Sequence, residues 1–413
     1  MTSPFHPLTI LRFSISISVL FFQSALIVAA QFLGFVVWPF SRKLFRSYIR
    51  HTMELWTLHL VALNQYFAPS KLVLTVDESI TRETVRLEDG IIVERDEGIE
   101  TILKRDGKGR ILGLKNMPWR VVLMANHQAR CLPCQCPRIR QNHSKRRSQV
   151  DADIRMAMII FDFIFLKRKW SADRPIIESN LQRSATKSQP LWLIVFPEGT
   201  VISESNRKKS KSFAEKNDLT DLTYSLLPRS TGLNLCTTTL TPSVDYVYDL
   251  TIGYDGIKPG EIPEKVYTLR RIYFQGMYPK RVHVHLRRFP LASLPTEDAA
   301  YATWLRDRWA EKDTLLAHFY AHGAFPGEER AAPARAKVRS EWTPEGDEVV
   351  IVEREEGEAV HVSATMEPKL NSLLDLTQVW FCLLPYLPIV QFIRQYWHAV
   401  AAIEAATAAA EAA

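Results

Sequence analysis

Short apolar runs that end in polar loops are the main pattern between residues 70 and 290. Runs of this kind, rich in aliphatic residues and separated by charged or glycine-containing spacers, occupy residues 72–76, 91–94, 111–114, 121–124 and 191–195. The pattern is typical of strands. One run leads into Asn126 and His127, and another leads through Pro197 into Glu198. Because sites in α/β folds lie at strand ends, we expect these two loops to carry the chemistry.

Longer segments predict helices. Residues 44–69 have the pattern of an aromatic-rich amphipathic helix, which the sequence leaves open as membrane-associated or core. Residues 296–320 are helical and mixed in charge. In the strand-like run 281–289, His283 and His285 alternate and therefore share one face. We interpret both as structural or surface residues, because a metal site would need further ligands that the pattern does not supply.

The most apolar segment is residues 13–40, which hold no charged side chain. A helix of this length can cross a hydrocarbon core of roughly 30 Å, and the run is too long for the apolar part of a typical signal peptide. We therefore predict a retained N-terminal membrane helix. Arg12 is the only Lys or Arg before it, whereas four follow between residues 42 and 50, so the positive-inside rule places the main body in the cytosol.

The C-terminal part changes character twice. Residues 323–368 lose apolar content and gain Glu, Arg, Pro and Gly, which predicts a polar linker or surface extension. Residues 369–398 are apolar with two prolines, typical of a membrane-associated hairpin or a span, and 399–413 are a low-complexity tail. With an anchor and amphipathic helix in residues 1–69, the catalytic domain is expected in residues 70–322.

Composition narrows the expected partners. The 413 residues carry a net charge of +7 and a pI of about 9.1, which fits an anionic membrane surface or phosphorylated substrates. No nucleic-acid-binding motif accompanies the charge, so nucleic acid is not an expected partner. The five cysteines form no disulfide framework, so a reducing compartment is expected.

The two strand-end loops have complementary chemistry. A histidine such as His127 can act as a general base when another group holds its tautomer. The turn Glu198-Gly199-Thr200 offers N–H groups and a hydroxyl to an anionic group, and glycine permits close approach. The basic stretch between residues 207 and 216 is either a solvated face or a clamp for substrate phosphates. These features suggest acyl or phosphoryl transfer on a lipid.

Four ordered blocks resemble those of the glycerolipid acyltransferases. They are Asn126-His127, FIFLKR at 163–168, FPEGT at 196–200 and LLPR at 226–229. The similarity is greatest to the branch of 1-acylglycerol-3-phosphate, lysocardiolipin and lysophosphatidylinositol acyltransferases, and it covers about residues 10–290. It implies an α/β fold with a mixed sheet flanked by helices and preceded by membrane-associated helices.

The resemblance also implies a reaction: acyl-CoA-dependent acylation of a lysophospholipid hydroxyl in phospholipid synthesis or remodelling. His127 would deprotonate the acceptor hydroxyl, Arg168 would pair with its phosphate, and Pro228 would shape the pocket near the acyl donor. No cofactor or metal is expected besides acyl-CoA as co-substrate, and the expected location is the endoplasmic reticulum membrane. The residues expected to bind substrate are Asn126, Arg168, Glu198, Gly199, Thr200, Pro228 and Arg229.

The chain departs from the family in its first block. The family places an aspartate five residues after the histidine, but position 132 is Leu132 and no acidic residue lies between His127 and Asp151. Loss of the aspartate of an analogous His–Asp pair costs on the order of 10⁴ in rate. Residues 129–155 also lose hydrophobic periodicity and gather prolines, arginines and cysteines.

Three explanations of this departure remain open. In the first, segment 129–155 is foreign to the functional protein, through a wrong exon boundary or a retained intron. In the second, the protein is a lipid-binding pseudoenzyme. In the third, Asp151 or Asp153 folds back onto His127. A zinc site is a further reading of the cluster formed by His127, Cys131, Cys134, Cys136 and His143. The crowding of these ligands is unlike the two separated pairs of known zinc sites.

Overall fold

The computed structural model describes residues 7–86, 92–128, 170–185, 190–342, 348–353, 360–370, 372–378, 391, 394–398, 400 and 401. These residues fall into two compact units. The first lies within residues 67–368, and the second combines residues 7–66 with those from 369 onward. Each unit is described by itself.

A seven-stranded sheet is the centre of the first unit. Its strands are β1 (Lys71–Val76), β6 (Arg120–Ala125), β7 (Leu191–Val195), β8 (Tyr246–Tyr254), β9 (Arg281–Pro290), β10 (Ala331–Ala332) and β13 (Ser363–Met366). Their order is β10-β13-β1-β9-β8-β6-β7. Strand β6 is parallel to β7 and β8, β1 is parallel to β9, and β8 and β9 are antiparallel. The sheet is therefore mixed, as predicted.

Three two-stranded ribbons accompany the sheet in the described part of the chain. Their strands are β2 (Arg82–Arg86) with β3 (Ile92–Asp96), β4 (Leu103–Arg105) with β5 (Ile111–Leu114), and β11 (Val338–Trp342) with β12 (Glu348–Val352). The five apolar runs that predicted strands correspond to β1, β3, β5, β6 and β7. These predictions are confirmed.

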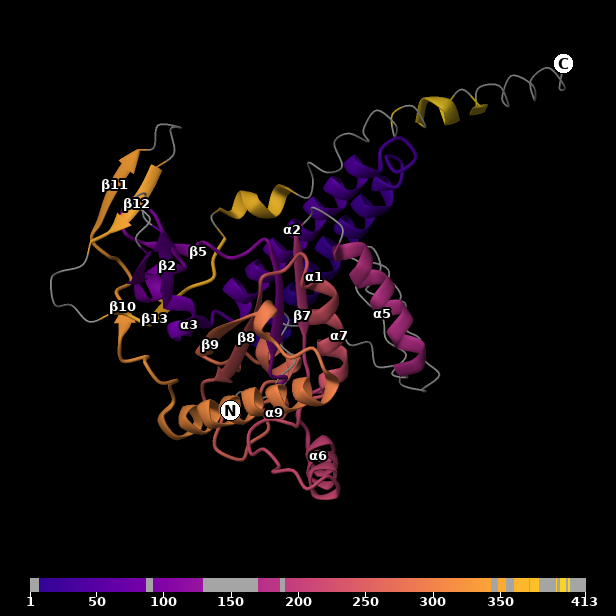
Figure 1. Cartoon of the computed structure of the whole chain (residues 1–413). Coiled ribbons are helices and arrows are strands. Elements are labelled where there is room, and N and C mark those ends of the chain that lie inside the picture. The colour runs from indigo at the N-terminus through magenta and orange to yellow at the C-terminus, as the bar shows by residue number, and fades with distance from the viewer. Residues whose placement is uncertain are drawn as a thin grey trace, which may run out of the picture. The chain divides into compact units, whose positions relative to one another are not determined.

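Helices cover both faces of the sheet (Figure 1). The longer ones in this unit are α5 (Trp170–Ala185), α6 (Glu204–Lys216), α7 (Ser230–Leu240) and α9 (Asp298–His322). The short ones are α3 (Glu78–Thr81), η1 (Gly98–Thr101), α8 (Pro263–Val266), η3 (Arg270–Phe274) and η4 (Leu291–Ser293). One face of β6 presents Val122 and Met124 to a core that contains Leu233 of α7 and Trp309 of α9. The other face belongs to a second core, with Ile80 of α3 and Ile99 of η1. The sheet is thus a central layer with helices on each side.

The segment 323–368 differs from the linker or surface extension that its composition predicts. Strand β13 pairs with β1 in antiparallel register from Leu72↔Met366 to Thr75↔Ser363, and β10 extends the sheet beyond it. Ala364 is fully buried against the second core. The composition of the whole segment does not indicate these strands because they are only two and four residues long.

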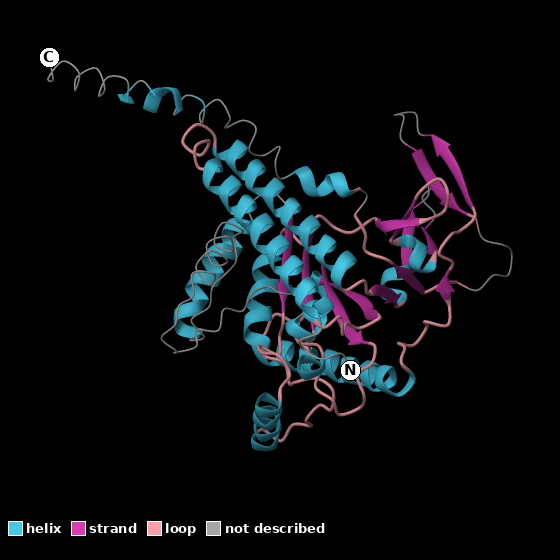
Figure 2. Cartoon of the chain, turned by 180° about the vertical axis from the view of Figure 1, so that it is seen from behind, coloured by secondary structure: helices cyan, strands magenta, loops and turns pink. Residues whose placement is uncertain are grey.

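The second unit contains two long helices that lie side by side (Figure 2). They are α1 (Pro7–Gly34) and α2 (Arg42–Phe67). Ile27 and Ala30 of α1 bury against Leu55 of α2, and Gln31 donates to Thr52 Oγ1 at 3.3 Å. The amphipathic segment 44–69 therefore buries its apolar face against another helix of the same chain.

The predicted membrane helix over residues 13–40 corresponds to a helix over most of its length. This segment lies mostly in α1, where Ile27 and Ala30 have a protein partner. Among the helices of the described residues, none combines the length and the apolar character needed to cross a bilayer. Of the apolar segment 369–398, the structure describes η5 (Leu373–Thr377) and a few flanking residues. The prediction of a membrane-associated hairpin there falls largely outside the described residues.

Candidate functional site

Asn126 fixes the end of β6 to the neighbouring strand. Its side-chain amide donates to the carbonyl of Ile252 at 3.0 Å and accepts the N–H of Ile252 at 2.8 Å. The residue is 2% exposed. Paired hydrogen bonds from one buried amide leave it little freedom, so the backbone that enters the next residue, His127, is held in place. The Asn126 side chain therefore binds strand β8 and does not face solvent.

His127 connects two of the predicted blocks. Its backbone N–H donates to Glu198 Oε1 at 3.1 Å, and its carbonyl accepts the N–H of Ile202 at 3.0 Å. Its ring stacks on Phe196 with centroids 4.5 Å apart and an interplanar angle of 26°. The loops after β6 and β7 are therefore joined by two hydrogen bonds and one ring contact, which is the convergence that the strand-end pattern predicts.

Glu198 is a buried acid and only 3% exposed. Burial raises the pKa of its carboxyl group to about 7, against the opposing effects of the His127 N–H, the charge of Lys312, the Leu226 backbone and the Trp309 indole. A carboxyl group with this pKa changes its ionisation state near neutral pH. Its oxygen Oε1 accepts the backbone N–H of His127, so Glu198 stabilises the loop that carries the histidine.

Gly199 and Thr200 complete the turn after β7. Gly199 has φ of +69°, in the left-handed region that favours glycine, and its N–H donates to the Phe196 carbonyl at 2.9 Å. The hydroxyl oxygen of Thr200 accepts from Asn206 Nδ2 of α6 at 3.0 Å. The turn is thus closed by local bonds and is tied to α6.

The fourth block lies against the third. The N–H of Arg229 donates to the Pro197 carbonyl at 2.8 Å, and Arg229 is the N-cap residue of α7. Its side chain is exposed, whereas Pro228 is half-buried. Three of the four blocks that carry the family resemblance therefore meet through backbone and side-chain contacts around His127.

The remaining predicted residues lie outside the described part of the chain. They are Arg168 of the second block and the whole of the atypical segment 129–155, including Leu132, Asp151 and the clustered cysteines. Their proposed roles stay predictions. Within the described residues, no group of three or more His, Cys, Asp or Glu side chains has a geometry suited to a metal ion.

Helix α9 carries site residues that the sequence reading missed. Both carboxylate oxygens of Asp313 are occupied: they accept the backbone N–H groups of residues 223–225 at 2.7–2.9 Å. The hydroxyl of Tyr320 donates to Gln128 Oε1 at 3.1 Å. Lys312 is completely buried. The spacing of Trp309, Lys312 and Leu316 on one helix face was the available signal, because it places a lysine among apolar core positions.

His283 and His285 share one face of β9, as predicted. Both are buried, so the surface reading is wrong and the structural one holds. His283 lies between two carboxylates, with Nδ1 2.8 Å from Glu328 Oε1 and Nε2 3.1 Å from Asp255 Oδ1. Burial lowers the pKa of His285 to about 4, so its ring is neutral at physiological pH.

The basic stretch after Thr200 forms α6. Arg207 donates to the carbonyls of Leu222 and Ser225 at 3.1–3.2 Å, so it supports the loop that leads to the fourth block. The lysines at 208, 209, 211 and 216 are exposed to solvent. They have the character of a solvated face.

Known proteins with similar sequences are acyltransferases. A family model described as the acyltransferase C-terminus matches residues 273–343. The 2-acyl-1-lysophosphatidylinositol acyltransferase of Saccharomyces cerevisiae is 34% identical over 199 residues, which cover 40% of this chain and 50% of that protein. Lysocardiolipin acyltransferase 1 of Danio rerio is 37% identical over 166 residues, which cover 40% of this chain and 41% of that protein. The predicted resemblance to the glycerolipid acyltransferases is confirmed.

The extent of similarity varies among these relatives. An uncharacterized acyltransferase of Schizosaccharomyces pombe is 27% identical over 323 residues, which cover 74% of this chain and 83% of that protein. The chain spans about half or less of the length of the other two relatives. A solved structure, the 1-acyl-sn-glycerophosphate acyltransferase PlsC from Thermotoga maritima, matches at 12% identity with a TM-score of 0.33. This match covers 72% of this chain and 97% of the PlsC chain. By family resemblance, the chain is thus related to acyltransferase enzymes.

Proposed function

We propose that this protein transfers an acyl group from acyl-CoA to the free hydroxyl of a lysophospholipid of the 1-acylglycerol-3-phosphate type. The observation that carries the proposal is the meeting of three family blocks at one edge of the sheet, with His127 held by Asn126, Glu198 and Phe196. The relatives named for lysophosphatidylinositol, lysocardiolipin and 1-acyl-sn-glycerol-3-phosphate support a lipid acceptor.

In this proposal His127 is the general base. It removes the proton of the acceptor hydroxyl, whose oxygen attacks the thioester carbonyl; the carbon–sulfur bond then breaks and CoA leaves as a thiol after accepting a proton. Gly199 and Thr200 line the acceptor side, and Arg168 is the expected phosphate partner. Pro228 shapes the pocket near the acyl donor, and Arg229 is hydrogen-bonded to Pro197 of the third block. The proposed place of the reaction is the surface of the endoplasmic reticulum membrane, which contains both substrates.

Release of CoA thiol and transfer of an acyl chain to the acceptor test the proposal directly. The full-length protein in phospholipid vesicles is given acyl-CoA with lysophosphatidic acid, lysophosphatidylinositol or lysocardiolipin, and product is measured by mass spectrometry. We expect at least one acceptor to gain one acyl chain. Protein that binds the lipids but yields no product with any of them contradicts the proposal.

A second candidate is a lipid-binding protein without turnover. It is favoured by one observation, Leu132 at the position where the family has an aspartate. It predicts saturable binding of acyl-CoA or lysolipid with no release of thiol. Sequencing of the transcript over codons 125–156 separates the two: an encoded acidic residue five positions after His127 favours the enzyme, and a transcript identical to the printed sequence favours the binding protein.

A further inference from the structure

A buried lysine on α9 holds the part of β8 that lies next to the site. The ammonium group of Lys312 donates to the Asp249 carboxylate at 2.5 Å, the Leu250 carbonyl at 2.9 Å and the Thr251 hydroxyl at 3.1 Å. The next residue along the strand is Ile252, which makes both hydrogen bonds to Asn126. One ammonium group therefore fixes the segment on which the position of Asn126 depends.

The same ammonium group acts on Glu198. Burial raises the pKa of Glu198, and the charge of Lys312 is one of the effects that lower it. In return, burial lowers the pKa of Lys312 while the nearby Asp249 and Glu198 carboxylates raise it. Trp309, one turn earlier on α9, lies under the ammonium group at 5.0 Å from its ring centroid. Lys312 thus contacts β8 through hydrogen bonds and lowers the pKa of Glu198 through its charge.

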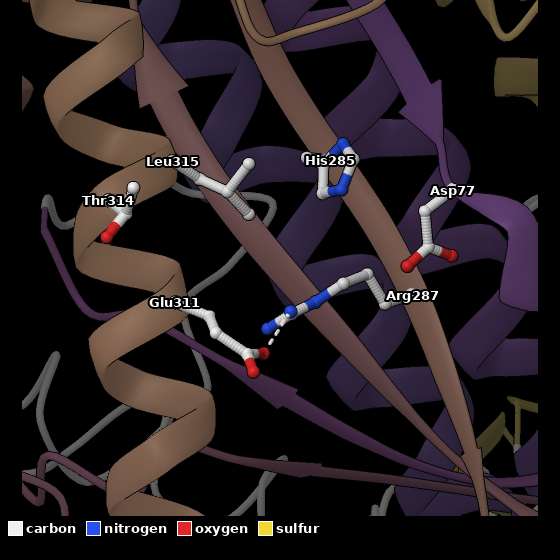
Figure 3. A pocket seen from close by; sticks show the side chains of 6 residues that line it. All are labelled: Asp77, His285, Arg287, Glu311, Thr314 and Leu315. Atoms are coloured by element: carbon white, nitrogen blue, oxygen red, sulfur yellow. Dashed lines mark hydrogen bonds and ion pairs between the residues drawn. The ribbon is translucent and has the colours of Figure 1, made fainter.

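Lys312 and the charged groups behind it form two pairs of opposite charge. The Asp249 carboxylate also accepts a hydrogen bond from the Arg287 guanidinium at 2.7 Å, and the same guanidinium donates to the Glu311 carboxylate at 2.7 Å. Burial opposes the ionisation of Asp249, but the charges of Lys312 and Arg287 outweigh it and lower its pKa. Figure 3 shows the outer end of this network, where Arg287 and Glu311 point toward each other. Both residues line a hollow of about 350 Å³. The hollow is also lined by Asp77, His285, Thr314 and Leu315.

We propose that Lys312 is a positioning residue of the site. It fixes the β8 segment that holds Asn126, and its positive charge stabilises the ionised carboxylate of Glu198, which accepts the backbone N–H of His127. Among the residues that the structure describes, the charged and titratable groups that act on Glu198 are His127 from the end of β6 and Lys312 from α9, with Asp249 and Arg287 behind the lysine. An ionised carboxylate near His127 favours the imidazolium that forms when the ring takes the acceptor proton. This part of the inference rests on the proposed acyltransferase function.

The backbone amide of His127 is a direct probe of Glu198, because it donates to that carboxylate. The chain is labelled at its eleven histidines, and the His127 amide signal is assigned by its loss in His127→Asn. Its chemical shift is followed against pH by NMR, and the part of the titration that disappears in Glu198→Gln is assigned to the Glu198 carboxyl group. In the wild type we expect a midpoint near pH 7. In Lys312→Met we expect the midpoint to rise by about one pH unit, since a neighbouring positive charge has been removed. In Lys312→Arg, which keeps the charge, we expect it to stay within a few tenths of a unit.

Two further variants keep the test decisive. Lys258→Met removes an exposed lysine and is expected to leave the midpoint unchanged. If Lys312→Met does not fold, Lys312→Met/Asp249→Asn removes both partners of the buried pair, and its midpoint is again expected to rise. An unchanged midpoint in a folded Lys312→Met or double variant overturns the proposal. The amide titration does not require enzymatic activity. A wild type without acyl transfer therefore contradicts the proposed function, whereas the role of Lys312 is still tested by the titration.

Discussion

Replacing Glu198 by glutamine removes a buried ionisable group and keeps an oxygen that can accept the N–H of His127. Burial raises the pKa of Glu198 from 4.5 to about 7 in the folded protein. Each pKa unit corresponds to about 1.4 kcal/mol, so ionisation in the folded state costs about 3 kcal/mol relative to the unfolded chain. Because the folded pKa is the higher one, the contribution of this group to stability is fully present below pH 4.5 and is lost as pH rises to about 7.

We therefore expect Glu198→Gln to gain stability relative to the wild type as pH increases. The free energy of unfolding is measured by urea denaturation at several pH values between 4.5 and 8 for both proteins. The difference between them is expected to change by about 3 kcal/mol in favour of the variant over this range. Glu215→Gln, at an exposed glutamate of α6, makes the same chemical change without burial. A difference that does not vary with pH, or that turns against Glu198→Gln, refutes the reasoning.

Three other substitutions test the framework around His127 by urea denaturation at fixed pH. Asn126→Ala removes both hydrogen bonds to Ile252 and is expected to cost about 2–3 kcal/mol, whereas an effect below about 0.5 kcal/mol contradicts the bonding described. Gly199→Ala places a side chain at φ of +69° and is expected to cost about 1 kcal/mol; a stabilised variant contradicts the left-handed conformation. Asp313→Ala deprives the N–H groups of residues 223–225 of their acceptor and is expected to cost about 2 kcal/mol, with Asp307→Ala on the same helix as the comparison.

The strands that carry the site could be predicted because their signals are local. An apolar run followed by a proline or a polar loop is sufficient to locate the ends of β6 and β7, and the structure places Asn126, His127 and Glu198 there. Their meeting is also predictable, since β6 and β7 are parallel neighbours whose carboxyl ends lie at the same edge.

The contributions of α9 and β13 depend on residues far apart in the sequence. Lys312 is buried because Asp249, 63 positions away, supplies a matching charge, and the helical pattern of α9 alone does not identify that partner. Strand β13 lies within a polar segment and joins the sheet through backbone pairing with β1. Such pairings follow from the whole fold, so a reading of local patterns predicted a helix of mixed charge and a linker in their place.

The claim that His127 is the general base at this edge of the sheet is tested most directly by the initial rate of acyl transfer. Wild type and His127→Ala are compared in the same vesicles, with acyl-CoA and the best acceptor, and His322→Ala at an exposed histidine serves as the control. General-base catalysis contributes about 10²–10⁴-fold, so we expect the rate of His127→Ala to fall by this factor and that of the control to stay unchanged. Equal rates of wild type and His127→Ala contradict the account.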